Sequence, residues 1–153
     1  MKTAVRDMGK VTTKIKVQNW DDITLLAAGK RKRAPRTIEA EALVDTGAVK
    51  LYLQKSVIES LGLRPIRTLF SHTMSDRTEK RRVFSPVDLE IMGRNGVFDV
   101  VEIPDTLPNI VGQIPLEDLD WVVDLRNQRL IPNPEHKMGE RYDEFTEVDC
   151  RRE

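Results

Sequence analysis

One short motif places a carboxylate in a tight turn at the end of an apolar segment. Asp45, Thr46, Gly47 and Ala48 follow directly on the apolar residues 42–44. A carboxylate held at such a point can exchange protons with a bound water molecule or with a substrate. Asp-Thr-Gly is also common as an ordinary turn, so the motif by itself leaves a catalytic and a purely structural Asp45 open.

A second short element lies well downstream of this turn. Ile110 and Val111 are apolar and are followed by Gly112, and the chain has no second Asp-Thr-Gly or Asp-Ser-Gly. Two carboxylates a few ångströms apart cannot both ionise comfortably, so such a pair shares one proton and can act as acid and base together. Because one chain offers one such aspartate, we expect a second copy to supply the other about a twofold axis. The alternative for this element is an ordinary buried strand end.

Composition excludes several classes of function. The 153 residues contain 25 Lys and Arg against 25 Asp and Glu, so no net charge favours nucleic acid or a membrane surface. The single cysteine, Cys150, excludes an intrachain disulfide and indicates a reducing, cytoplasmic location. No apolar run approaches the ~18–20 residues of a membrane span. His72 and His136 lack metal-ligand spacing, and no phosphate-binding glycine loop is present, so we expect no metal and no cofactor.

Most of the chain has the pattern of strands. Alternation and β-branched residues predict strands over residues 11–17 and 37–44, and the strand pattern returns between residues 69 and 101. Strands are expected over 83–91 and 97–103. The turn 93–96 should join them, because its Asn-Gly pair is a strong hairpin signal. A closing hairpin is predicted from residues 121–125 and 129–131.

Helical signals are few and short. Ser56 and Glu59 have the spacing of a capping box, and Gly62 suits a left-handed stop, which together predict a helix over 56–61. One helical turn is expected over 115–119, with Pro115 in its first position. Residues 21–30 are expected to form a connection, in which residues 23–26 could add a short strand.

Two polar regions complete the organisation of the chain. The basic run 30–33 could contact nucleic acid, but a solvated loop is the favoured interpretation because no aromatic residues interleave with the charges. Residues 1–132 are expected to form one domain and 133–153 a polar tail, either flexible or in contact with a dimer partner. Within that tail, residues 141–148 could form a strand against the partner.

The order of these elements over roughly residues 11–132 resembles the retropepsin-like aspartic proteases, the family of retroviral proteases and their bacterial relatives. The resemblance implies an all-β fold, a closed acid-protease-like barrel with one or two short helices that forms half of a C2 homodimer. It also implies an aspartic endopeptidase, in which water activated between two Asp45 carboxylates hydrolyses a polypeptide substrate without a cofactor. Neither nucleic acid nor a membrane is an expected partner.

The resemblance assigns roles to the neighbours of Asp45. It implies that Thr46 hydrogen-bonds across the twofold axis and stiffens the paired turns. Gly47 lets backbone approach the carboxylates without a Cβ in the way, and the small Ala48 leaves room for the substrate backbone. The Ile110–Gly112 element is expected to pack beneath the active-site loop, where Gly112 permits close contact.

The hairpin near the middle of the chain occupies the position of the family's flap, which closes over an extended peptide and excludes water. Its candidate residues are Met74, Ser75, Asp76, Arg77 and Thr78. Viral members have glycine-rich flap tips, whereas this tip is charged and polar. The charges either favour a polar substrate or are simply solvated.

Two other functions compete with the peptidase. A binding module could keep the dimeric fold and grip peptides without cutting them. A β-rich nucleic-acid binder could use the basic residues between Lys30 and Arg36, and strongly salt-dependent binding would be its signature. In either case Asp45 would be an ordinary turn or capping residue.

Overall fold

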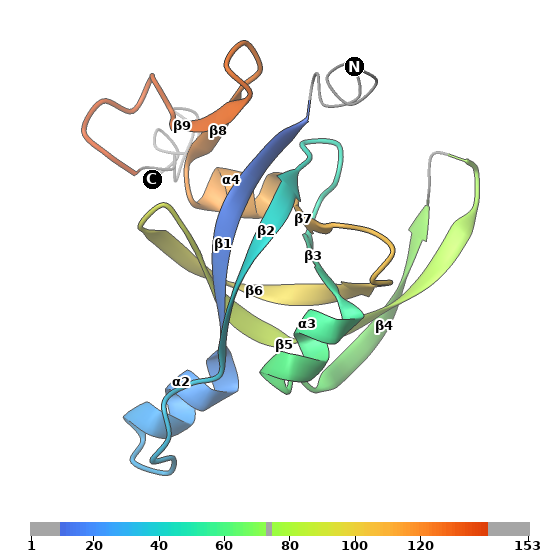
Figure 1. The fold of residues 1–153 in the computed structure, drawn as a ribbon, viewed down its shortest axis with the longest axis vertical. Helices are drawn as coiled ribbons and strands as arrows, with labels where there is room; N and C mark the ends of the chain where they lie inside the picture. Colours follow the sequence, from blue (N-terminus) through green and yellow to red (C-terminus); the bar gives the residue numbers. More distant parts are fainter. Residues whose placement is uncertain (1–9, 73–74, 141–153) are drawn as a thin grey trace, which may run out of the picture.

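The computed structural model describes residues 10–72 and 75–140, and strands dominate this part of the chain (Figure 1). The strands are β1 (Val11–Asn19), β2 (Thr37–Val44), β3 (Leu51–Gln54), β4 (Pro65–His72), β5 (Thr78–Ile91), β6 (Arg94–Ile103), β7 (Asn109–Val111), β8 (Trp121–Asp124) and β9 (Arg129–Pro132). The helices are α2 (Trp20–Ala27), α3 (Lys55–Leu61) and α4 (Gln113–Asp118). The described residues include no helix with the length and apolar content needed to cross a membrane.

Six strands close into a barrel. They follow one another in the order β1, β2, β7, β3, β6 and β5, and β1 pairs antiparallel with both β2 and β5, which closes the ring. The prediction of a mainly β, closed-barrel fold with short helices is therefore confirmed. The described residues contain three helices, where one or two were expected.

The barrel is filled by side chains that alternate along its strands. In β1, Val11, Ile15 and Val17 are buried, while the residues between them are half-buried or exposed. Each large apolar side chain removed from water contributes about 1.5–3 kcal/mol to the stability of the fold. The other strands supply buried side chains in the same way, among them Leu51, Leu53, Val87, Leu89, Ile91, Val100 and Val111. This packed interior is the rigid support for the turn that carries Asp45.

The short strand β7 enters the sheet between two strands that are neighbours in sequence. It runs parallel to β2, with Val44 opposite Val111, and antiparallel to β3, with Leu51 opposite Val111. The chain that joins β2 to β3 is the segment with the Asp-Thr-Gly-Ala motif. The barrel topology thus brings the Ile110–Gly112 element directly beside that motif.

Strands β4 and β5 form a long arm that extends from the barrel (Figure 1). Within the described residues β4 pairs only with β5, and Phe70 lies opposite Lys80 in the register. The expected hairpin in this region is therefore present. Its first strand begins at Pro65, earlier than the expected start near residue 69.

The segment expected to be a connection is instead helix α2. The side chain of Asn19 accepts a hydrogen bond of 3.1 Å from the amide of Asp22 and so caps the first turn. Asp22 is the buried residue of this helix, whereas Leu25 and Leu26 are exposed. The prediction of a connection was wrong because the helix is held by its cap and a buried charge instead of an apolar face.

Helix α3 forms at the expected place but not with the expected cap. Gln54 occupies the N-cap position without a side-chain cap bond, and the amide of Ser56 donates to Asp105 Oδ1 at 3.0 Å. The Ser56–Glu59 capping box was therefore wrong, because a carboxylate from a distant loop takes its place. At the other end Gly62 is left-handed, with φ of 64°, as predicted.

The turn between β5 and β6 is shifted from its predicted position. Ile91 pairs with Arg94 across a two-residue turn formed by Met92 and Gly93, whose φ values are 47° and 87°. Positive φ at both central residues is the geometry of a type I′ hairpin turn. The Asn-Gly pair predicted to turn lies inside β6 instead, with Gly96 opposite Leu89.

The closing hairpin is confirmed as β8 and β9, which pair antiparallel and form a two-stranded sheet of their own. After β9, the amide of Asn133 donates to the carbonyl of Asp120 at 3.4 Å. His136 Nδ1 lies 2.6 Å from Asp120 Oδ2. The first residues of the expected tail therefore contact the body of the domain, while residues 141–148 lie outside the described residues.

Candidate active site

Asp45 lies immediately after β2, in a turn that is closed by its own backbone and side chain. Its carboxylate Oδ1 accepts a hydrogen bond of 2.9 Å from the amide of Gly47, and its carbonyl accepts one of 3.1 Å from the amide of Ala48. Asp45 is half-buried, while Thr46 and Gly47 are exposed. The carboxylate is thus fixed in orientation at the surface of the barrel.

The Ile110–Gly112 element holds this turn from the other side. The amide of Asp45 donates to the carbonyl of Val111 at 3.0 Å, and the amide of Gly112 donates to the carbonyl of Lys50 at 2.8 Å. One residue further on, the amide of Gln113 donates to the carbonyl of Ala48 at 2.8 Å. The structure therefore brings together the two elements that the sequence singled out.

Gly112 is confined by backbone on all sides. A Cβ at this position would lie 2.4 Å from the carbonyl oxygen of Lys50 and 2.8 Å from that of Ala48. No side chain fits there unless the Asp45 loop moves. At Gly47 a Cβ would meet only Asp45 Oδ1, at 3.2 Å. A Cβ is therefore excluded by backbone at Gly112, whereas at Gly47 it would crowd only the Asp45 carboxylate.

Asn109 is a site residue that the sequence did not reveal. This buried side chain accepts a hydrogen bond of 2.8 Å from the amide of Gln54 and donates one of 3.3 Å to the carbonyl of Glu41. As the first residue of β7, Asn109 thus links this strand to Glu41 of β2 and to Gln54 of β3. A polar residue directly before the apolar pair of Ile110 and Val111 is the signal that could have pointed to it.

Thr46 opens onto a cavity of about 700 Å³ next to the motif. The rest of its lining comes from α4, the β8–β9 hairpin and the segment after β9, and includes Leu116, Trp121, Leu125 and His136. The face of Trp121 is covered by the guanidinium of Arg94, whose Cζ lies 4.4 Å from the ring centroid. The surface around the motif is therefore concave and partly apolar.

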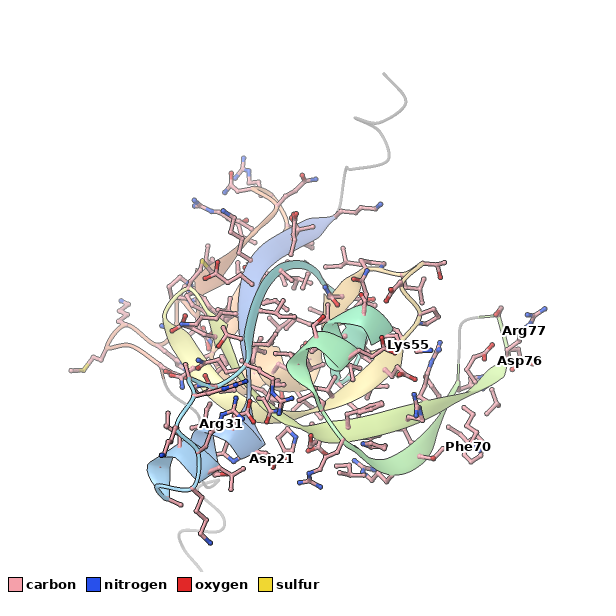
Figure 2. The ribbon with its side chains drawn as sticks, turned by 60° about the horizontal axis from the view of Figure 1, so that its bottom comes forward. Asp21, Arg31, Lys55, Phe70, Asp76 and Arg77 are labelled. Carbon is pink, nitrogen blue, oxygen red and sulfur yellow. The ribbon has the colours of Figure 1, made fainter. Side chains whose placement is uncertain are left out.

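The candidate flap residues lie at the end of the β4–β5 arm. Figure 2 shows Asp76 and Arg77 at the tip, and Ser75 precedes them, while Thr78 begins β5. In Figure 1 the tip stands apart from the turn after β2, so this single chain does not bring these residues to Asp45. Met74 lies outside the described residues.

Arg31 of the basic run and the nearby Arg36 both pair with one buried carboxylate, that of Asp22. Arg36 donates to both oxygens of Asp22, at 2.9 and 3.0 Å, and Arg31 Nη1 lies 3.3 Å from Asp22 Oδ1. The hydrogen bonds from Arg36 hold the pKa of Asp22 below its usual range. Figure 2 shows Arg31 near α2, beside the helix that carries this carboxylate. Arg31 thus ties the run to the fold, while Lys30, Lys32 and Arg33 are exposed, which fits the interpretation of a solvated loop.

No family model matches the sequence, and no curated protein matches it. Within the part of the chain that the structure describes, no group of three or more His, Cys, Asp and Glu residues is arranged to hold a metal ion.

Proposed function

We propose that this protein is an aspartic endopeptidase of the retropepsin-like type, active as a homodimer with one Asp45 from each copy. The observation that carries the proposal is the insertion of β7 beside the motif. It fixes a half-exposed carboxylate turn on the barrel surface through the bonds from Asp45 to Val111 and from Gly112 to Lys50. A cytoplasmic location is part of the proposal.

The chemistry needs two carboxylates that share one proton. The ionised carboxylate takes a proton from a water molecule, whose oxygen attacks the peptide carbonyl carbon, while the protonated carboxylate gives its proton to the carbonyl oxygen. When the tetrahedral intermediate collapses, the carbon–nitrogen bond breaks and the leaving nitrogen takes the proton that the first carboxylate removed from water. A hydroxyl of the intermediate becomes the new carbonyl and returns its proton to the second carboxylate. The amide of Gly47 would keep each Asp45 carboxylate in the orientation that this exchange requires.

The β4–β5 arm has a role in the proposed dimer. Its length and its position at the edge of the barrel make it suitable to fold over an extended polypeptide and to exclude water. Polar residues at its tip, among them Asp76 and Arg77, would then lie near the substrate or the partner's arm. A substrate with polar side chains fits this tip.

Replacement of the carboxylate tests the proposal. Asp45→Asn keeps the size and the Gly47 hydrogen bond, so we expect the fold to persist while cleavage of an unfolded protein such as casein falls at least about 1,000-fold. Asp88→Asn is the matched control, because Asp88 lies on β5 and bonds Asn95 instead of the motif loop. New peptide termini detected by mass spectrometry are the readout, and undiminished cleavage by Asp45→Asn would rule the proposal out.

Mixed dimers test whether each copy supplies half of the site. When wild-type chain and Asp45→Asn chain exchange at equal concentration, about one quarter of the dimers carry two intact aspartates. We therefore expect specific activity per total protein to fall to about a quarter of the undiluted value. A fall to one half would show that each copy acts alone.

A dimeric peptide-binding module on the same fold is the second candidate, favoured by the charged tip of the arm. It predicts peptide binding that survives in Asp45→Asn and no new termini during long incubation at roughly pH 4–7, where a carboxylate pair can hold one proton. Cleavage by the wild-type chain that Asp45→Asn abolishes would exclude this module.

A further inference from the structure

We infer that the second copy docks on a surface made by the motif loop, α4 and the β8–β9 hairpin, with Leu125 as its apolar anchor. This inference rests on the proposed dimer but adds to it, since the twofold pairing of Asp45 leaves open which further surfaces meet. We call this surface the hairpin face and define it by Thr46, Val49, Ile114, Trp121 and Leu125.

Exposed apolar side chains flank the motif on the hairpin face. Val49 and Ile114 are 52% and 47% exposed, and the amide of Ile114 donates to the carbonyl of Val49 at 2.9 Å, so the two residues are adjacent. One lies in the loop after Asp45 and the other in α4. Apolar surface gathered beside a candidate catalytic carboxylate indicates contact with another polypeptide.

Leu125 adds the most exposed apolar residue of this face. It is 71% exposed, and it lines the cavity of about 700 Å³ that Thr46 also lines. The turn that carries it is fixed, because Asp124 accepts hydrogen bonds from the amide and the side chain of Asn127 at 3.3 and 2.8 Å. A large apolar side chain is therefore presented in a defined position next to a concave surface.

Several polar groups of the cavity are already paired within the chain, whereas the buried indole nitrogen of Trp121 has no hydrogen-bond partner among the described residues. Gln113 donates to Glu117 at 2.7 Å, and His136 lies 2.6 Å from Asp120. Covering the cavity with apolar surface from another chain would thus leave these pairs intact, and would avoid the large penalty of burying a lone charge. This arrangement suits a protein partner better than a charged small ligand.

A second copy is the occupant that the geometry favours. The paired-aspartate mechanism places a twofold axis close to Asp45, and Thr46 is shared by the motif and the cavity. A copy that brings its own Asp45 to this axis would bring the adjacent Val49 and Ile114 toward the interface, and Leu125 through the cavity that it shares with Thr46. Among the described residues the β8–β9 sheet has two strands, and because a two-stranded sheet is marginally stable alone, it would gain from packing against such a partner.

Leu125→Asp tests the hairpin face. The residue is exposed in the single chain, so the barrel should fold normally, as circular dichroism would verify. Both copies carry the charge at the interface, and we expect the dimer dissociation constant to rise at least about 100-fold in analytical ultracentrifugation. Leu26→Asp is the matched control, because Leu26 is 40% exposed on α2, at the opposite end of the molecule from β8 and β9 (Figure 1). It should leave the constant unchanged.

The outcomes separate this inference from the proposed function. A Leu125→Asp chain that dimerises and cleaves like wild type overturns the hairpin face and leaves the peptidase standing. Dissociation by Leu125→Asp together with full cleavage by Asp45→Asn supports the interface and overturns the peptidase. Val49→Asp provides an independent variant, expected to weaken the dimer as well. A wild-type chain that stays monomeric at every concentration at which it cleaves overturns the inference.

Discussion

The amide of Asp45 donates a 3.0 Å hydrogen bond to the carbonyl of Val111, so the motif turn is held by a strand from much later in the chain. Val111 is fully buried and belongs to the barrel core. The orientation of the carboxylate is therefore coupled to the packing of the core. Changes that disturb this contact should affect stability and activity together, whereas changes to the turn alone should affect activity.

Gly112→Ala should destabilise the domain by roughly 3 kcal/mol or more. The new Cβ would meet the Lys50 carbonyl oxygen at 2.4 Å, and backbone cannot move aside without breaking the bonds around Asp45. Urea unfolding measures the loss. Gly47→Ala is the comparison, since its Cβ meets only the Asp45 carboxylate at 3.2 Å. It should lower activity with little loss of stability, and an equal loss of stability in both variants would contradict this account.

Asn109→Ala should cost about 2–3 kcal/mol in unfolding free energy. The change leaves the amide of Gln54 and the carbonyl of Glu41 without their buried partner. Asn95→Ala serves as control, because Asn95 is exposed and bonds the Asp88 side chain, and it should cost less than about 0.5 kcal/mol. Similar losses in the two variants would show that Asn109 does not tie the three strands together.

Asp22→Asn should cost about 3 kcal/mol at pH 7, because it leaves Arg36 without its buried counter-charge. The folded pKa of Asp22 lies below the unfolded value, so this contribution is fully present above about pH 4 and declines as the pH falls further. The difference in unfolding free energy between wild type and Asp22→Asn, measured by urea titration, should therefore become smaller toward pH 2. Asp21→Asn breaks an exposed pair with Arg64 and should cost less than about 1 kcal/mol.

His136→Ala should free the segment after β9 and cost about 1–2 kcal/mol. The imidazole is 11% exposed and contacts Asp120 at 2.6 Å, so its loss removes a nearly buried polar contact. Limited proteolysis should then cut faster within residues 133–140, with the cut sites read by mass spectrometry. His72→Ala is the control, since His72 is 67% exposed, and it should leave the cutting rate in this segment unchanged.

The strands that support the motif were predictable because their own residue types favour a strand without reference to the rest of the chain. Ala42 and Val44 at the end of β2 and Val111 in β7 are buried in the barrel, while Ile110 is half-buried, and apolar side chains are the natural choice at such positions. Their pairing was not predictable from pattern, because register between distant segments leaves no local signal. The neighbourhood of the two elements followed only from the resemblance to a known family.

Helix α2 and Asn109 escaped prediction for a common reason. The apolar residues of α2 do not form a buried stripe, and its anchor is the buried Asp22, which looks like a surface residue in the sequence. Asn109 likewise looks like the end of a loop. In both cases a buried polar side chain acts through partners far away in the sequence, and such partners become visible only in three dimensions.

Because β7 inserts between β2 and β3, the loop around Asp45 is completed only after β7 has been synthesised. A chain still attached to the ribosome has residues 45–48 long before residues 109–114 exist. Until then the amide of Asp45 lacks its partner Val111 and the carbonyl of Lys50 lacks its partner Gly112. The geometry proposed for peptide cleavage is thus assembled only when almost the whole barrel sequence has been made. The topology would thereby delay the proposed cleavage until residues 109–114 have been made and have joined the barrel.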